Sequence, residues 1–164
     1  MFYQSCPEGG TGKNPRLAAR MMRAYGEILD RALTYSYQHL LTEGLDEESS
    51  CLFLRLARQS MEHFHALGRL IRDLGGDPGV SLRLKTPRID LSEDAAGRSL
   101  PVIRRMLRGD MQTTAEGITE LESLSSLTDE YPRATWTLRR LIREEQEAYE
   151  ALTEQYEKVR DSLL

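Results

Sequence analysis

The residues of this chain whose chemistry and position are most informative are Glu145 and His63. Each lies among apolar residues that recur three and four positions apart, a spacing that marks the buried face of an amphipathic helix. A carboxylate on such a face must find a partner or take up a proton, because an isolated charge is costly in a protein core. An imidazole at the same level can hydrogen-bond it, and the two together could supply two ligands to a metal ion. We therefore take this pair as the centre of a candidate site.

Two further groups, Asp110 and His39, lie near the inward faces of their helices and could be recruited as additional metal ligands. The apolar stripes also lose their bulky side chains at one level, where the small residues are Ala32, Ser60, Thr114 and Ala148. Small residues that face one another in a helical bundle leave room for a metal cluster or a ligand. These four residues are the predicted lining of a pocket around His63 and Glu145.

A second pair, Glu62 and His65, has the spacing of half a dimetal site, because residues three apart share one face of a helix. At about 100° per residue, however, both side chains point away from the apolar stripe of their helix. They share that side with four arginines, which are Arg55, Arg58, Arg69 and Arg72. We predict a solvated, charged face there rather than a metal site.

Four long amphipathic stretches must position these side chains. Apolar residues at helical spacing predict helices over about residues 15–43, 47–74, 95–124 and 132–162. Asn14 and Pro15 are a typical start for the first helix, as N-cap and first helical residue. The Gly-Gly-Asp-Pro run at 75–78 ends the second helix. Residues 1–14 are rich in glycine and polar residues, and we predict that they form a flexible tail.

The lengths of the connections predict how the helices pack. Short loops after the first and third helices make each pair an antiparallel hairpin. The connection over about residues 75–94 is long enough to run the length of the bundle. The predicted fold is therefore all-α, a single four-helix bundle domain over residues 15–164, built as two helical hairpins joined by a long crossover.

Composition argues against several classes of function. The chain has 22 basic and 26 acidic residues, a net charge of −4, and no basic stripe of the kind that binds nucleic acid. No apolar run approaches the roughly 18 residues that cross a bilayer, and the N-terminus does not resemble a signal peptide. Cys6 and Cys51 stand in unrelated contexts, which indicates neither a disulfide framework nor a thiolate metal site. We expect a cytoplasmic protein with no membrane span and no nucleic-acid partner.

Four segments of the chain carry a family resemblance. They read NPRLAARMMRAYG, ALTYSYQHLL, HALGRLIRDLGGDP and, more loosely, LIREEQEAYEALTEQYEKV. With them the chain resembles the ferritin-like superfamily, in particular its rubrerythrin-like and bacterioferritin-like branches and the small manganese-catalase-type proteins of spore coats. The resemblance covers most of the chain outside the tail and the crossover.

The resemblance implies where a dimetal site would lie. In that superfamily the ligands are a Glu on the first helix, Glu-x-x-His on the second, a Glu on the third and Glu-x-x-His on the fourth. The corresponding positions of this chain are Ala32, Ser60, His63, Thr114, Glu145 and Ala148. Two of six ligands remain, and one carboxylate is too few for two divalent ions, which need about four.

The main functional hypothesis is a ferritin-like bundle that has lost the dimetal oxidoreductase site and acts as a structural or interaction protein, in a spore-associated or stress-related assembly. No cofactor is expected, and iron or manganese would be the metal if one is bound. One alternative is an oxidoreductase with a rearranged metal site at His63 and Glu145, assisted by Asp110 or His39. Another is a small-molecule site in the bundle core. Because relatives are often dimers or larger, we expect a homo-oligomer.

Overall fold

The computed structural model describes residues 12–80 and 99–164, and within these ranges every regular element is an α-helix. The helices are α1 (Pro15–Thr42), α2 (Glu47–Asp73), α3 (Ser99–Ser125) and α4 (Pro132–Asp161). The prediction of an all-α bundle is confirmed. The predicted tail up to residue 11, the crossover from residue 81 and the start of the third helix before residue 99 lie outside the described residues.

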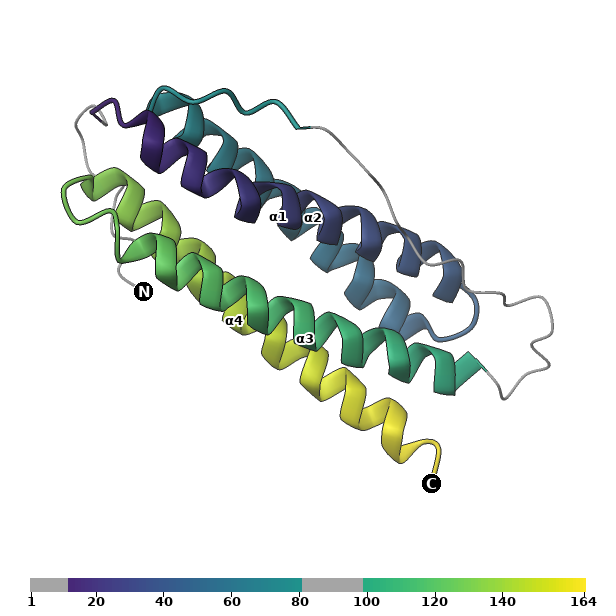
Figure 1. The fold of residues 1–164 in the computed structure, drawn as a ribbon. Helices are drawn as coiled ribbons and strands as arrows, with labels where there is room; N and C mark the ends of the chain where they lie inside the picture. The colour runs from purple at the N-terminus through teal and green to yellow at the C-terminus, as the bar shows by residue number, and fades with distance from the viewer. Residues whose placement is uncertain (1–11, 81–98) are drawn as a thin grey trace.

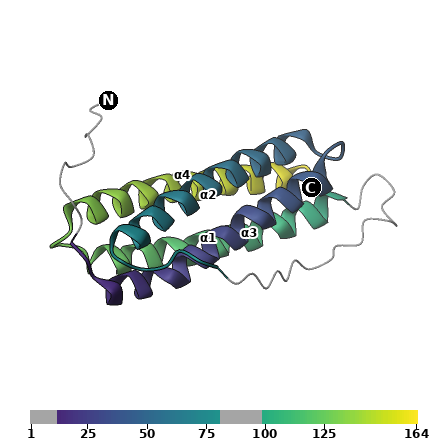
Figure 2. The same ribbon diagram turned by 90° about the horizontal axis from the view of Figure 1, so that it is seen from above.

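The four helices form two antiparallel hairpins, as Figures 1 and 2 show. α1 packs mainly against α2 and α3 mainly against α4, while contacts of α2 with α4 and of α1 with α3 close the bundle. α2 ends and α3 begins at opposite ends of the bundle (Figure 1). This is the predicted arrangement, and it differs from a bundle whose consecutive helices are all joined by short loops.

The ends of the first hairpin follow from local sequence. The side chain of Asn14 accepts a hydrogen bond from the backbone N–H of Leu17 at 3.1 Å, and Pro15 occupies the first turn, where its missing N–H has no consequence. Gly44 and Gly75 follow the ends of α1 and α2 with φ of 81° and 93°. This left-handed conformation closes a helix and is strained for residues with a Cβ atom.

The apolar core is divided into two clusters by a polar layer. One cluster includes Met21, Ile28, Ile71, Leu121 and Leu138, and the other includes Phe53, Leu56, Ile103, Leu107 and Leu152. On every helix, the positions between the two clusters include buried polar side chains. These are Arg31, Ser60, His63, Asp110, Thr114 and Glu145. The layer predicted from small and polar residues is therefore a real division of the core.

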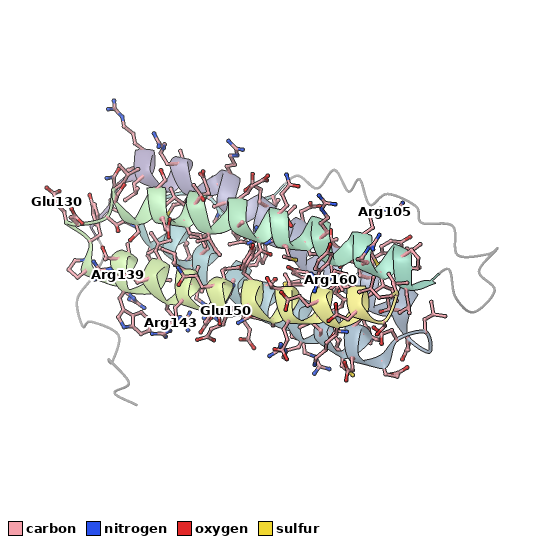
Figure 3. All side chains as sticks on the ribbon, turned by 90° about the horizontal axis from the view of Figure 1, so that it is seen from below. Arg105, Glu130, Arg139, Arg143, Glu150 and Arg160 are labelled. Atoms are coloured by element: carbon pink, nitrogen blue, oxygen red, sulfur yellow. The ribbon has the colours of Figure 1, made fainter. Side chains whose placement is uncertain are left out.

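The outer surface of the bundle is densely charged. Arg139, Arg143, Glu150 and Arg160 of α4 project outward, as Figure 3 shows. None of the described helices contains an apolar stretch long enough to cross a bilayer.

Candidate functional site

The centre of the polar layer is a hydrogen bond between α2 and α4. Nδ1 of His63 lies 2.9 Å from Oε1 of Glu145, and the two residues are only 2% and 3% exposed. The structure thus brings together the two side chains that the sequence singled out, although they are 82 residues apart.

The second ring nitrogen of His63 also faces a carboxylate. Nε2 lies 2.7 Å from Oε2 of Glu144, whose side chain is 30% exposed and so connects the layer to solvent. An ionised carboxylate can only accept hydrogen bonds, so both ring nitrogens must donate. The geometry therefore favours the imidazolium form of His63, held between two carboxylates.

Arg31 of α1 completes the layer from the opposite side. Its Nη2 lies 3.2 Å from the same Oε1 of Glu145, and the two side chains are 8% and 4% exposed. One carboxylate oxygen thus receives hydrogen bonds from a guanidinium and an imidazole. Arg31, Glu145, His63 and Glu144 form a chain of alternating positive and negative groups, which we call the core charge relay.

The pKa values of the relay follow from a competition between burial and pairing. Burial is the largest single influence on His63 and Glu145, and it disfavours the charged form of each. For His63 the hydrogen bonds to Glu144 and Glu145 outweigh burial, so its pKa is raised. For Glu145 the hydrogen bond from His63 and the charge of Arg31 outweigh burial, so its pKa is lowered. The pKa of Glu144 is also lowered, chiefly by its hydrogen bond from His63.

Asp110 lies in a second polar group between α1 and α3, not in the relay. Its Oδ1 accepts a hydrogen bond of 3.1 Å from Nε2 of Gln38, while its Oδ2 and the amide oxygen of Gln38 are buried without a partner. Burial raises the pKa of Asp110 to about 7, partly opposed by the Gln38 hydrogen bond. Tyr35 is near Gln38 in the sequence and Thr114 is near Asp110, and their hydroxyl oxygens are 3.2 Å apart. Asp110 therefore sits where it readily takes up a proton.

His39 is held at the end of the bundle, away from the relay. Its Nδ1 lies 3.0 Å from both the carbonyl oxygen and the hydroxyl of Ser50, next to the α1–α2 turn. Its predicted recruitment to the central site is not supported by this placement. Glu62 and His65 are exposed, which confirms that this metal-like pair faces solvent.

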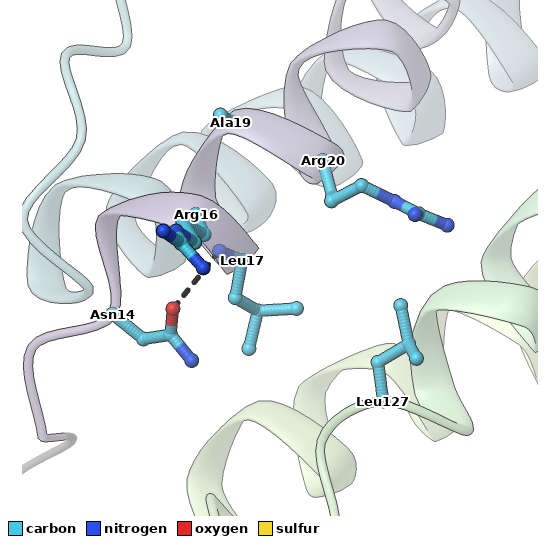
Figure 4. Close-up of a pocket in the computed structure, with 6 residues that line it drawn as sticks. All are labelled: Asn14, Arg16, Leu17, Ala19, Arg20 and Leu127. Carbon is cyan, nitrogen blue, oxygen red and sulfur yellow. Dashed lines mark hydrogen bonds between the residues drawn. The ribbon is translucent and has the colours of Figure 1, made fainter.

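The four small residues predicted to line a pocket are buried, but they line neither of two hollows in the described part of the chain. A narrow hollow with an empty volume of about 150 Å³ lies between α1 and α3, lined by Ala24, Glu27, Ile28, Arg31, Gly117 and Leu121. A shallow, open hollow with an empty volume of about 1020 Å³ lies at the bundle end, between the start of α1 and the α3–α4 loop (Figure 4). Neither is lined by Ala32, Ser60, Thr114 or Ala148.

Arg31, Glu144 and Gln38 were not identified as site residues from the sequence. A signal for Arg31 is present, because it lies three residues after Ile28 and four before Tyr35, both of which are buried. Its charge places it among outward residues in a simple amphipathic reading. Glu144 was not identified because it lies at the edge of the apolar stripe of α4. Its side chain is half-buried, and its carboxylate contacts His63.

Comparison with known proteins supports the fold. No family model matches the sequence, and no curated protein matches it at the sequence level. Among solved structures, the chain is similar to the bacterioferritin of Desulfovibrio desulfuricans, a protein with a diiron site. The TM-score is 0.71 at 18% identity, over 90% of this chain and 82% of the bacterioferritin chain. The chain thus has the ferritin-like four-helix fold, as its resemblance to that superfamily implied.

Proposed function

We propose that this chain is a ferritin-like bundle that works without a dimetal centre, as a structural or interaction protein rather than an oxidoreductase. The observation that carries this proposal is the core charge relay. The two residues that remain of the implied ligand set, His63 and Glu145, hydrogen-bond each other, and their other polar contacts are made by Glu144 and Arg31.

The side chains of this layer do not fit a diiron or dimanganese centre. Two divalent ions need about four carboxylates to balance their charge, together with ligands on all four helices. The implied positions on α1, α2, α3 and α4 that lack a ligand hold Ala32, Ser60, Thr114 and Ala148. The layer instead contains a guanidinium, which repels cations. Among the residues that the structure describes, no group of three His, Cys, Asp or Glu side chains is placed to hold a metal ion.

A rearranged mononuclear site is less well supported. It would need a third ligand beside His63 and Glu145. Asp110 is paired with Gln38, and His39 is bound to Ser50 near the α1–α2 turn. Recruiting either one would require breaking these contacts and moving a buried or half-buried side chain across the core.

The metal content and redox activity of the purified protein test the proposal. We expect substoichiometric iron, manganese and zinc after growth with added metal, and no oxidation of ferrous iron or turnover of peroxide above the buffer rate. A bacterioferritin treated in parallel serves as the positive control. Two metal ions per chain, together with iron oxidation that is lost in His63→Ala, would contradict the proposal.

We also propose that the protein is a cytoplasmic homo-oligomer. Leu40 and Leu45, which are 68% and 48% exposed, lie near the α1–α2 turn and are large apolar side chains that a contact between two chains would cover. Light scattering coupled to size-exclusion chromatography measures the mass in solution. A mass equal to that of one chain of 18.7 kDa at all concentrations would contradict oligomer formation.

A further inference from the structure

Arg31 reaches the centre of the bundle through a notch that Gly117 leaves in α3. A Cβ atom at position 117 would lie 2.6 Å from Nη1 of Arg31 and 3.1 Å from its Nη2 and Cζ. The guanidinium would have to move away from these contacts, and any such movement changes its hydrogen bond to Glu145. Glycine destabilises the interior of a helix relative to alanine. Gly117 therefore lowers the stability of α3, while its missing side chain leaves room for Arg31.

The guanidinium has little access to water. The Arg31 side chain is 8% exposed, its Nε has no hydrogen-bond partner, and the hollow beside it is too narrow for a water molecule. Arginine does not lose its proton in proteins, so the side chain remains a buried cation. A buried cation is tolerated only when it is paired, and the pairing observed here is with Oε1 of Glu145.

The charges of the relay balance. Arg31 and the imidazolium of His63 are positive, and Glu144 and Glu145 are negative. Without Arg31, Glu145 would face only His63, which it shares with Glu144. The carboxylate that a metal ion would neutralise in the related fold is therefore neutralised here by a side chain of the protein.

We infer that the positive charge of Arg31 replaces that of a metal ion and stabilises the buried carboxylate of Glu145. The missing side chain of Gly117 leaves room for the Arg31 guanidinium. This inference deepens the proposed function, on which it rests, because it states what replaces the metal. It concerns this chain's own residues and assigns Gly117 and Arg31 a joint role.

Chemical complementation tests whether the layer requires a cation of this shape. Arg31→Ala removes the guanidinium and leaves a space of matching form beside Gly117. We expect the melting temperature of Arg31→Ala to fall, and millimolar guanidinium chloride to raise it again. Urea, which has nearly the same shape but no charge, and sodium chloride at the same concentration are the controls and should not raise it. The melting temperature of the wild-type protein should not rise with any of the three.

A pair of glycine variants on the same helix provides a second test, which does not depend on Arg31→Ala folding. Gly117→Ala places a methyl group against the guanidinium, whereas Gly109→Ala meets no atom within 4 Å. We expect Gly109→Ala to raise the melting temperature, because alanine favours the helix, and Gly117→Ala to lower it. In the double variant with Arg31→Met, which shortens and neutralises the side chain, Gly117→Ala should no longer lower it.

Three outcomes would overturn the inference: a rescue by urea equal to that by guanidinium, no rescue at all in a folded Arg31→Ala protein, or equal effects of the two glycine substitutions. Titration of the wild-type protein with Mn²⁺ separates this failure from that of the proposed function. Tight Mn²⁺ binding by the wild-type protein would contradict the absence of a metal centre, whereas the rescue experiment reports on Arg31 alone.

Discussion

At the scale of single residues, the stability of the polar layer depends on pH in two opposite ways. It falls at high pH, where His63 loses its proton, and at low pH, where Glu144 and Glu145 take one up. The raised pKa of His63 means that its contribution is fully present below the pKa of an unfolded histidine and is lost as pH rises through the folded value. The lowered pKa values of Glu144 and Glu145 mean that their contributions are present above the unfolded pKa of glutamate and are lost as pH falls through the folded values. The relay is therefore most stabilising at pH values above the unfolded pKa of glutamate and below the unfolded pKa of histidine, in mildly acidic solution.

Asp110 adds a pH dependence of its own, and we predict that Asp110→Asn removes it. Because its folded pKa is raised from 3.8 to about 7, the stability that it confers is greatest below pH 3.8 and is lost as pH rises to about 7. Asparagine has the shape of the protonated acid, and its amide can donate to the unpaired oxygen of Gln38. Asp110→Asn should therefore be more stable than the wild type at pH 8, by roughly 2–4 kcal/mol, and similar to it near pH 4.

Urea unfolding at several pH values measures this difference. Gln112→Glu serves as a charge control, since residue 112 is an exposed neighbour on the same helix. An equal free energy of unfolding for Asp110→Asn and the wild type at pH 8 would show that the buried carboxylate carries no such cost.

At the scale of the elements, helix ends are joined to other parts of the fold by side chains. Asn14 caps α1 through Leu17 and also donates from Nδ2 to the hydroxyl of Tyr131, 3.0 Å away, just before α4. The backbone N–H of Asn14 donates to the carbonyl of Leu74 at 2.8 Å. One residue thus ties the start of α1 to the end of α2 and to the α3–α4 loop, which fixes how the two hairpins meet at this end.

We predict that Asn14→Ala lowers the free energy of unfolding by about 1–2 kcal/mol, because the helix loses its cap and the loop loses a hydrogen bond. Tyr131→Phe removes only the bond to the loop and should cost less, about 1 kcal/mol. Asn14→Ser, which restores a cap without reaching Tyr131, should resemble Tyr131→Phe. Thermal and urea unfolding compare the three variants, and equal stability of Asn14→Ala and the wild type would contradict the role of the cap.

At the scale of the whole molecule, the polar layer separates two apolar clusters, but all four helices contribute side chains to both. Every helix passes through both apolar clusters, so neither cluster can be lost without breaking the helices that form the other. The similarity to bacterioferritin concerns this frame of four helices. In this chain the frame holds a chain of ion pairs between its two apolar clusters.

This continuity predicts a single cooperative unfolding transition. Leu138→Ala and Leu152→Ala remove fully buried side chains of α4 from different clusters, and each should cost about 2–5 kcal/mol. Trp136 fluorescence reports on one half of the bundle and far-ultraviolet circular dichroism on all helices, and the two curves should coincide in both variants. Separate transitions in either variant would show that the polar layer divides the bundle into independent units.

The sequence by itself determined the helices, their hairpin pairing and the level of the polar layer. Periodic apolar residues, an Asn-Pro start and a Gly-Gly-Asp-Pro stop are local signals, each readable within a few turns of helix. For the same reason His63 and Glu145 could be placed inward, and Glu62 and His65 outward.

Only the tertiary structure decided what His63 and Glu145 contact. The bond from Arg31 to Glu145 joins residues 114 positions apart, and Gly117 matters only because Arg31 lies against it. Long charged side chains extend from one helical face to another. The face of the helix on which such a residue lies therefore does not reveal where its charged group is. For that reason Arg31 was not among the predicted site residues, and the cation that balances the buried carboxylate became visible only in the packed bundle.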